Sequence, residues 1–281
     1  MLKKKKQECL KIGLALSGGS ALGIAHIGAI KALRENKIPL HCVAGTSAGA
    51  IVATALAFGV PLEKMIELSC RLSWSNISEF GYSKLGLNSN WPVGEIMIKL
   101  VGDKKIEDAP IPLAIIATDI DTGEKIVFRK GSVADAVRAS TCLPGFFIPT
   151  KIKGKRLVDG GLVENLPLSP LRKMGADVRI GVDLGHFRTL KKTHNILDVI
   201  TNSYNILIKP QENILVEDAE VLIEPHLEKF HSTDFKKADE LNQAGYQATK
   251  LKIPQIKKYL GRKIKPESKS FWQKWVDFFG K

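Results

Sequence analysis

Three short glycine-rich segments hold the residues best suited to chemistry. They read SGGSALG at 17–23, GTSAG at 45–49 and DGG at 159–161. Ser47 has the placement of a nucleophile on a sharp strand-to-helix turn, where flanking glycines leave room for the tight backbone. The pentapeptide alone is also compatible with an ordinary tight turn that contains a serine.

A serine hydroxyl is a weak nucleophile unless a neighbouring base accepts its proton. Asp159 is suited to that task if burial raises its pKa toward the working range; the alternative is that it only caps the turn. Backbone N–H groups near Gly19 and Ser20 can stabilise a developing oxyanion, because glycine permits close approach. The predicted site consists of the pair Ser47 and Asp159, the oxyanion loop Gly18, Gly19, Ser20 and Gly23, and the turn glycines Gly45, Gly49, Gly160 and Gly161.

Short apolar segments alternate with helical patterns around these turns. We expect strands at 11–16, 42–44, 113–118, 125–128, 179–184 and 220–223, a hairpin at 151–158, and helices at 24–36, 50–58, 135–140 and 233–251. Such alternation is typical of a largely parallel sheet that is covered on both faces. Because the carboxyl ends of parallel strands gather at one sheet edge, we expect the three glycine-rich turns to face one crevice.

Six segments, in this order, resemble the patatin-like phospholipases, which are serine lipid acyl hydrolases with a Ser–Asp dyad. They are LALSGGSALGIAHIGAIKAL, VAGTSAGAIVATALA, ATDIDTGEKIVF, VRASTCLPGFFIP, VDGGLVENLP and HSTDFKKADELNQAGYQA. The resemblance implies a three-layer α/β/α sandwich with a mainly parallel central sheet. It also implies that Ser47 is the nucleophile and Asp159 its general base. The corresponding activity is that of a phospholipase A or a lysophospholipase-like esterase, acting on lipid esters at a membrane surface.

The first segment departs from the family's usual pattern, Gly-Gly-Gly-x-Arg/Lys-Gly. Ser20 stands at the third glycine and Leu22 at the basic residue. Ser20 still offers a backbone N–H, whereas Leu22 removes a side chain that could contact a phosphate. A neutral-lipid esterase, a thioesterase and a catalytically weak lipid-binding regulatory module therefore remain alternatives.

Other classes fit less well. A dinucleotide-binding loop would need glycine at Ser20 and a carboxylate after the second strand, where Ala44 and Gly45 stand. An α/β-hydrolase with a Ser-Asp-His triad places more strands before its nucleophile than the 46 residues ahead of Ser47 allow. The histidines have no i, i+4 metal spacing, so we expect neither metal nor cofactor. No motif indicates nucleic-acid binding, and the oligomeric state is left open.

Charge and cysteine usage indicate the surroundings in which the protein works. The formal net charge of +13 favours contact with anionic surfaces. Cys9, Cys42, Cys70 and Cys142 form no C-x-x-C pair, which indicates a reducing compartment without a disulfide framework. We therefore expect a cytoplasmic protein, with peripheral contact at the inner membrane face as a further expectation. The uncharged run at 38–62 is interrupted by polar residues, Gly and Pro, so we do not interpret it as a membrane span.

We expect one hydrolase domain at 11–260 and a basic, aromatic, amphipathic tail at 261–281. Helical spacing in the tail would place Phe271, Trp275, Phe278 and Phe279 on one face, as in helices that lie in a membrane interface. The segment 71–92 is looser and carries the aromatic residues Trp74, Phe80, Tyr82 and Trp91. Either these aromatics pack the segment onto the domain, or the segment forms a cap that lines an apolar substrate channel.

Overall fold

A computed structural model describes residues 10–81, 83–185, 192–193, 196–215, 218–231 and 233–261. Its central sheet has the strand order β11-β10-β1-β2-β5-β9-β8, and β6 also pairs with β5. The strands are β1 (Ile12–Leu16), β2 (Cys42–Thr46), β5 (Leu113–Asp119), β6 (Lys125–Phe128), β8 (Thr150–Ile152), β9 (Lys155–Asp159), β10 (Val178–Val182) and β11 (Val221–Ile223). A second, small sheet pairs β3 (Glu79–Phe80), β4 (Gly86–Ser89) and β7 (Gly145–Phe147).

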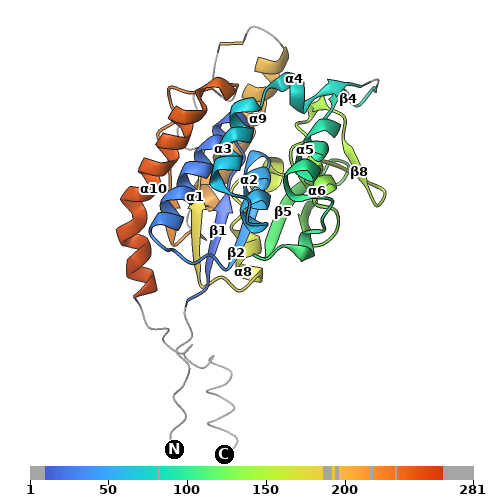
Figure 1. Ribbon diagram of the computed structural model, residues 1–281. Helices are drawn as coiled ribbons and strands as arrows, with labels where there is room; N and C mark the ends of the chain where they lie inside the picture. The colour runs from blue at the N-terminus through green and yellow to red at the C-terminus, as the bar shows by residue number, and fades with distance from the viewer. Residues whose placement is uncertain are drawn as a thin grey trace, which may run out of the picture.

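Helices cover both faces of the central sheet. They are α1 (Ala25–Glu35), α2 (Ala48–Ala57), α3 (Leu62–Arg71), α4 (Trp74–Ile77), α5 (Trp91–Val101), α6 (Val133–Ser140), α7 (Gly161–Glu164), α8 (Ser169–Lys173), α9 (Ile196–Leu215) and α10 (Ala238–Leu260). Short 3-10 helices are η1 (Ser20–Ile24), η2 (Ile106–Asp108) and η4 (Phe235–Lys237). In Figure 1, α10 runs beside α1 and α3 on one flank, and α5 and α6 pack together on the other.

The two faces of the sheet differ in side-chain size. Ile12, Leu14 and Leu16 of β1 point into the larger core, which they share with α1, α2 and α10. The opposite face presents small residues, among them Ala15, Ala44 and Ala114, and is covered by Leu166, Leu168 and Leu171 from the segment around α8. This alternation with period two is what a sheet buried on both faces requires. The prediction of a three-layer α/β/α sandwich is confirmed.

Strand β5 is the place where the sheet stops being parallel. Four strands, β11, β10, β1 and β2, run parallel to one another and to β5, whereas β6 and β9 run antiparallel to β5. Ile115 pairs with both Gly45 of β2 and Phe128 of β6, while Ala117 pairs with both Ile126 of β6 and Asp159 of β9. A strand has only two edges, so β2 and β9 share the edge of β5 that β6 does not occupy. They approach each other end to end along it.

The expected strands and the hairpin are all present, with ends shifted by one or two residues. The helix expected at 233–251 begins as η4, continues as α10 from Ala238 and runs on to Leu260. Three long helices, α3, α5 and α9, were not expected. The tail from 262 onward, Cys9, Tyr82, His186 and His194 lie outside the described residues.

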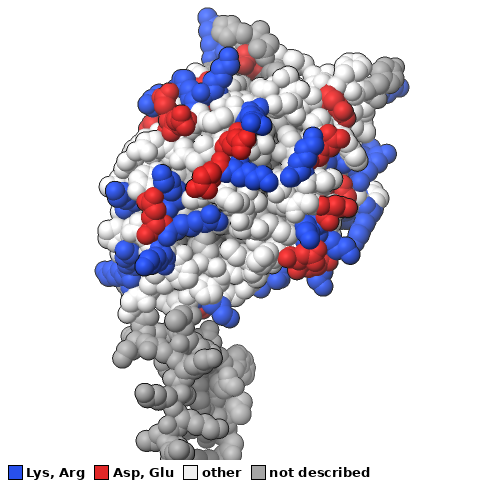
Figure 2. Space-filling model, viewed as in Figure 1, with Lys and Arg blue, Asp and Glu red and all other residues white. Residues whose placement is uncertain are grey.

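Cys42 and Cys142 are buried among apolar neighbours. Burial raises the pKa of the Cys42 thiol to about 11 and that of Cys142 to about 12, so both behave as small apolar side chains at neutral pH. In the described part of the chain, no helix combines the length and apolar character needed to cross a bilayer. On the face shown in Figure 2, basic side chains are interspersed with acidic ones and do not form a single patch.

Candidate active site

Ser47 occupies a sharp turn between β2 and α2. Its φ of 53° and ψ of −125° put a non-glycine residue at positive φ, a conformation that costs energy and is common at functional sites. Its backbone N–H donates to Ser140 Oγ at 2.9 Å. Gly45 and Gly49 are required by close packing, because a Cβ on Gly45 would collide with the Gly49 carbonyl and one on Gly49 with the Leu16 carbonyl. The local geometry is that of a nucleophile elbow.

Asp159 ends β9 and is 2% exposed. Its Oδ1 atom accepts two hydrogen bonds, from the Gly161 N–H at 2.9 Å and from the Tyr204 hydroxyl at 2.6 Å. Its backbone is held as well: its N–H donates to the Cys142 carbonyl at 2.8 Å, and its carbonyl accepts from Thr118 Oγ1 at 2.9 Å. The carboxylate is therefore fixed in orientation. A Cβ on Gly161 would collide with the Tyr204 hydroxyl, and one on Gly160 with a β5 carbonyl.

The shared edge of β5 brings Ser47 and Asp159 together. Thr46, the last residue of β2, pairs with Ile116, and Asp159 pairs with the next residue, Ala117. The two strands therefore meet head to head at consecutive positions of β5. The expectation that all three glycine-rich turns follow parallel strands was wrong for the third turn, since β9 is antiparallel to β5. The turn after β9 reaches the same crevice because the pairing of β9 with β5 stops where the pairing of β2 with β5 ends.

The first glycine-rich segment lies beside Ser47. The Gly18 N–H donates to Asn165, and a Cβ on Gly18 would come within 3.1 Å of Ser47 Cβ. The N–H groups of Gly19 and Ser20 donate to no other group among the described residues. Both residues line the same cavity as Ser47. These two N–H groups are therefore the ones available to a ligand oxygen near Ser47.

The same loop contains a strained serine and a close helix contact. Ser20 has a φ of 52°, so it adopts at some cost a backbone conformation that glycine adopts readily. Gly23 lets η1 pack against α2, because a Cβ there would lie 2.6 Å from Ala48 Cβ. The positions predicted for this loop thus all lie around the end of β1 and the start of α2.

A cavity of about 150 Å³ opens over these residues. Ser47, Asp159, Gly19 and Ser20 line one part of it. The remaining lining is largely apolar and includes Ile27, Ile51, Leu68, Leu100 and Phe147. Polar atoms are thus gathered where the chemistry would occur, in an otherwise apolar space that suits a hydrocarbon chain.

Leu22 does not take part in this cavity. It is 3% exposed and packs in the larger core, whereas its neighbours Ala21 and Gly23 line the cavity. An arginine at this position would have to bury its guanidinium group among apolar residues. The structure therefore makes Leu22 a packing residue, and an effect of the missing basic side chain on headgroup recognition stays a prediction.

The aromatic residues of the segment 71–92 have different roles. Trp74 lines the cavity and makes edge-to-face contacts with Phe146 and Phe235. Trp91 is half exposed and lies over the Arg138 guanidinium at 4.4 Å, and Phe80 is 87% exposed. Trp74 thus both packs the segment and lines the cavity, while Phe80 does neither.

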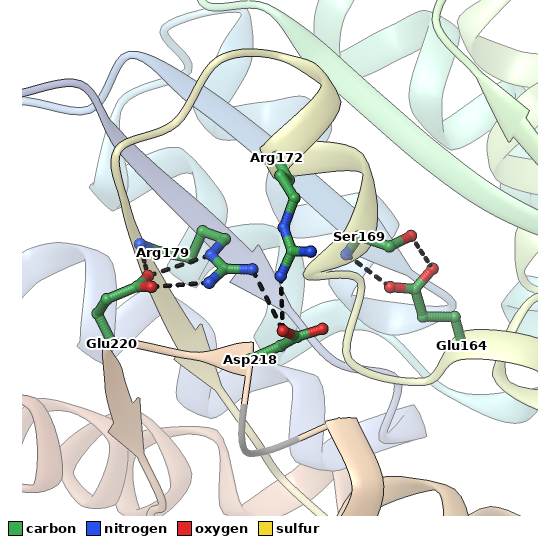
Figure 3. A network of polar contacts seen from close by, with 6 residues as sticks. All are labelled: Glu164, Ser169, Arg172, Arg179, Asp218 and Glu220. Carbon is green, nitrogen blue, oxygen red and sulfur yellow. Dashed lines mark hydrogen bonds and ion pairs between the residues drawn. The ribbon is translucent and has the colours of Figure 1, made fainter. Parts of the chain in front are cut away.

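The helix that follows Asp159 is fixed by buried polar contacts. Glu164, the last residue of α7, is 1% exposed and accepts hydrogen bonds from the Ser169 N–H at 2.8 Å and the Ser169 hydroxyl at 2.7 Å (Figure 3). Lys125 neutralises the carboxylate at 2.9 Å. These contacts join α7 to the start of α8 and to β6, so the turn after Asp159 is held from both sides.

A second group of charges in Figure 3 joins α8 to β10 and to the start of β11. Arg179 contacts Glu220 at 2.7 Å, and Asp218 accepts from Arg172 at 2.6 Å. Burial acts to raise the pKa of Glu220, but its hydrogen bonds with Arg179 outweigh this effect and hold the pKa below its ordinary value. This ion-pair network stabilises the far side of the sheet and does not line the cavity.

The described residues contain no cluster of three or more His, Cys, Asp or Glu side chains arranged to hold a metal ion. Sequence reasoning missed Tyr204, whose hydroxyl bonds Asp159 from 45 positions further along the chain. No motif marks it in the sequence. The helical pattern of residues 196–215 was the only signal that could have drawn attention to this segment.

Comparison with known proteins decides the family. The model of the patatin-like phospholipases matches residues 14–172, which is more than half of the chain. The chain belongs to the patatin-like phospholipase family. The matched residues include the glycine-rich segments at 17–23, 45–49 and 159–161, so the predicted resemblance is confirmed.

Curated relatives of this patatin-like chain are longer than it is. An uncharacterised NTE family protein of Mycobacterium tuberculosis is 34% identical over 177 residues, which is 62% of this chain and 49% of the relative. A lysophospholipase of Emericella nidulans is 32% identical over 180 residues, or 62% of this chain and 12% of the relative. The chain thus spans about half the length of the first relative and much less of the second.

Solved structures agree in fold with this patatin-like chain. VipD of Legionella pneumophila has a TM-score of 0.52 and 14% identity, over 89% of this chain and 67% of VipD. The type III effector ExoU has a TM-score of 0.52 and 14% identity, over 91% of this chain and 54% of ExoU. At this identity the two structures show the shared fold.

Proposed function

We propose that the protein is a serine lipid acyl hydrolase, of the phospholipase A or lysophospholipase type, that uses Ser47 and Asp159 as a catalytic dyad. Ser47 attacks the ester carbonyl, and Asp159 accepts the hydroxyl proton. The N–H groups of Gly19 and Ser20 stabilise the oxyanion of the tetrahedral intermediate, where one donor is typically worth about 3 kcal/mol. The intermediate collapses by breaking the ester C–O bond, and the leaving alcohol takes the proton from Asp159. Water then attacks the acyl-serine while Asp159 accepts a proton from it, and collapse of the second intermediate returns this proton to Ser47 as the fatty acid leaves.

One observation carries this proposal: a single apolar cavity is lined by a strained serine, a buried carboxylate and two backbone N–H groups that donate to none of the described residues. A serine that merely sat in a turn would not require glycines at 45 and 49 to avoid collisions. A capping aspartate would not need a tyrosine hydroxyl from a distant helix. The apolar cavity, the serine, the carboxylate and the two N–H groups together match the parts that ester hydrolysis needs.

The lining of the cavity supports a lipid as the substrate. Its walls are apolar apart from the end that holds Ser47 and Asp159, so an acyl chain fits better than a polar group. The lysophospholipase name of a relative agrees with this choice. A neutral-lipid esterase and a thioesterase remain the alternatives, because the loop carries the buried Leu22 and no basic side chain at that position. The net charge of +13 supports action at an anionic membrane surface.

Covalent labelling with a fluorescent alkyl phosphonate tests the proposal. Wild-type protein should be labelled and should hydrolyse a lysophospholipid, whereas Ser47→Ala should do neither. Ser69→Ala is the matched control, since Ser69 also lines the cavity but its hydroxyl donates to the Ile66 carbonyl within α3. It should keep both activities. Labelling that persists in Ser47→Ala, or that disappears in Ser69→Ala alone, would reject the assignment.

Asp159→Asn tests the base separately. The amide oxygen can still accept from Gly161 and Tyr204, so the fold should be kept while the proton acceptor is lost. We expect slow labelling and a loss of most turnover, in the range of about a hundredfold or more. Near wild-type rates would show that Asp159 only caps its turn.

A further inference from the structure

Exposed apolar side chains are concentrated in two segments of the chain. Of the eleven large hydrophobic side chains that are exposed among the described residues, eight come from two segments. They are Phe80, Leu85, Leu87 and Trp91 in one segment and Ile196, Val199, Ile206 and Leu207 on α9. Scattered single exposures are normal on a protein surface, but a concentration of this kind marks an interaction site. We call these eight residues the apolar rim.

Helix α9 exposes four large apolar residues on its outer face, although its Ile208 is buried. Ile196, Val199, Ile206 and Leu207 are 50–63% exposed, and their spacing places them on one helical face. The cavity side of the same helix carries polar residues, since Thr201, Tyr204 and Asn205 line the cavity. A helix that packs on a domain in water normally shows the reverse arrangement. The outer face of α9 is therefore built for contact with an apolar medium.

The two segments of the rim form one surface. Strand β4, between Leu85 and Trp91, pairs with β7, where Gly86 lies opposite Gly145. A Cβ on Gly145 would lie 3.6 Å from Ile200 Cδ1 of α9. Trp74 and Ile77 of α4, which directly precedes the first segment in the chain, line the cavity. In Figure 1, α4, β4 and α9 lie at the same end of the molecule, opposite α8.

We propose that the apolar rim is the surface by which the protein docks on an anionic lipid layer, so that the cavity opens toward the lipid phase. This inference rests on the proposed function, because an acyl chain must pass from the layer into the cavity. Lys84 is exposed beside Leu85, and Lys192 is exposed four positions before Ile196. Cations at the border of an apolar surface favour anionic headgroups. A second copy with the same charge of +13 is the less suitable partner.

Sedimentation with vesicles of phosphatidylcholine and phosphatidylglycerol tests the rim. The double variant Ile206→Ser/Leu207→Ser should bind at least about tenfold more weakly than wild type, because two apolar side chains no longer leave water. Phe80→Ser/Leu87→Ser should weaken binding in the same way from the other segment. The matched control is Leu251→Ser on α10, away from the rim, where Leu251 is 80% exposed. This variant should bind like wild type.

The variants should keep phosphonate labelling of Ser47 and hydrolysis of a soluble short-chain ester, since none of these residues lines the cavity. Vesicle binding unchanged in both double variants, or weakened equally in Leu251→Ser, would overturn the inference. The inference would also be overturned if light scattering showed a dimer that the rim substitutions dissociate, because the apolar rim would then join two copies of the chain. If Ser47 is not labelled but the rim variants lose vesicle binding, the proposed hydrolase fails while the lipid-docking surface stands.

Discussion

Replacing Tyr204 with phenylalanine would remove one hydroxyl and nothing else from the environment of the proposed base. The ring would still fill the space above Gly161, so the packing of α9 should be kept. The lost hydrogen bond is short, at 2.6 Å, and its acceptor is a buried carboxylate. Hydrogen bonds to charged groups contribute about 1.5–3 kcal/mol. If that energy orients Asp159 in the transition state, kcat/KM should fall roughly ten- to a hundredfold.

The pH dependence separates this role from packing. A hydroxyl that donates to a carboxylate favours the ionised form, so its removal should let Asp159 take up a proton at higher pH. The acidic limb of the pH–rate profile should therefore move to higher pH in Tyr204→Phe. Cys142 also interacts electrostatically with Asp159, but burial raises its pKa to about 12, so its thiol stays neutral throughout the measured range.

The assay is the rate of phosphonate labelling and of soluble-ester hydrolysis between about pH 4 and pH 9, a range that brackets ordinary carboxyl values. Tyr246→Phe is the matched control, because the Tyr246 hydroxyl donates to a Glu35 carboxylate oxygen at 2.7 Å on the surface, between α10 and α1. It should leave rate and profile unchanged. A folded Tyr204→Phe protein with the wild-type rate and an unmoved acidic limb would refute the reasoning.

Three further substitutions test the structure elsewhere. Ser20→Gly should keep the labelling rate and should change the free energy of unfolding by no more than about 1 kcal/mol, because glycine relieves the strain at φ 52° but gains freedom in the unfolded chain. Leu22→Arg should lower that free energy by roughly 3 kcal/mol or more in denaturant titration without raising phospholipid turnover, since the new charge is buried. Glu220→Gln should cost about 1 kcal/mol at pH 7. Because folding lowers the pKa of Glu220 from its ordinary value of 4.5, the ionised carboxylate stabilises the fold at pH values above 4.5. This stabilisation is lost as the pH falls through the lowered pKa, so wild type and variant should then be equally stable.

The sequence was sufficient to predict the placement of residues at tight turns, which depends on local backbone shape, while their catalytic roles stay predictions. Ser47 and its glycines follow a short apolar strand, and the collisions that a Cβ would cause explain why the pattern is so restricted. Asp159 was predictable for the same reason, since it precedes two glycines in tight contact. Local chemistry of this kind leaves a mark in adjacent residues.

Features that depend on contacts between distant segments were not predictable. Tyr204 bonds Asp159 across 45 positions, and nothing near residue 204 indicates that partner. The direction of β9 was also missed, because hydrophobic periodicity is the same in parallel and antiparallel strands. The burial of Leu22 was not predictable either, because nothing in the loop motif indicates that η1 turns this side chain into the core.

The end-to-end meeting of β2 and β9 has a consequence for how this chain can tolerate insertions and deletions. Ile116 and Ala117, adjacent in β5, set the spacing between the end of β2 and the end of β9, and thus between Ser47 and Asp159. One residue inserted between them would add about 3.4 Å to that spacing and turn the rest of β5 to the opposite face. Extra residues in the turn at Lys153–Gly154, which precedes β9, would leave the spacing between the ends of β2 and β9 unchanged. Length variation among close homologues should therefore be found in that turn and be absent within β5.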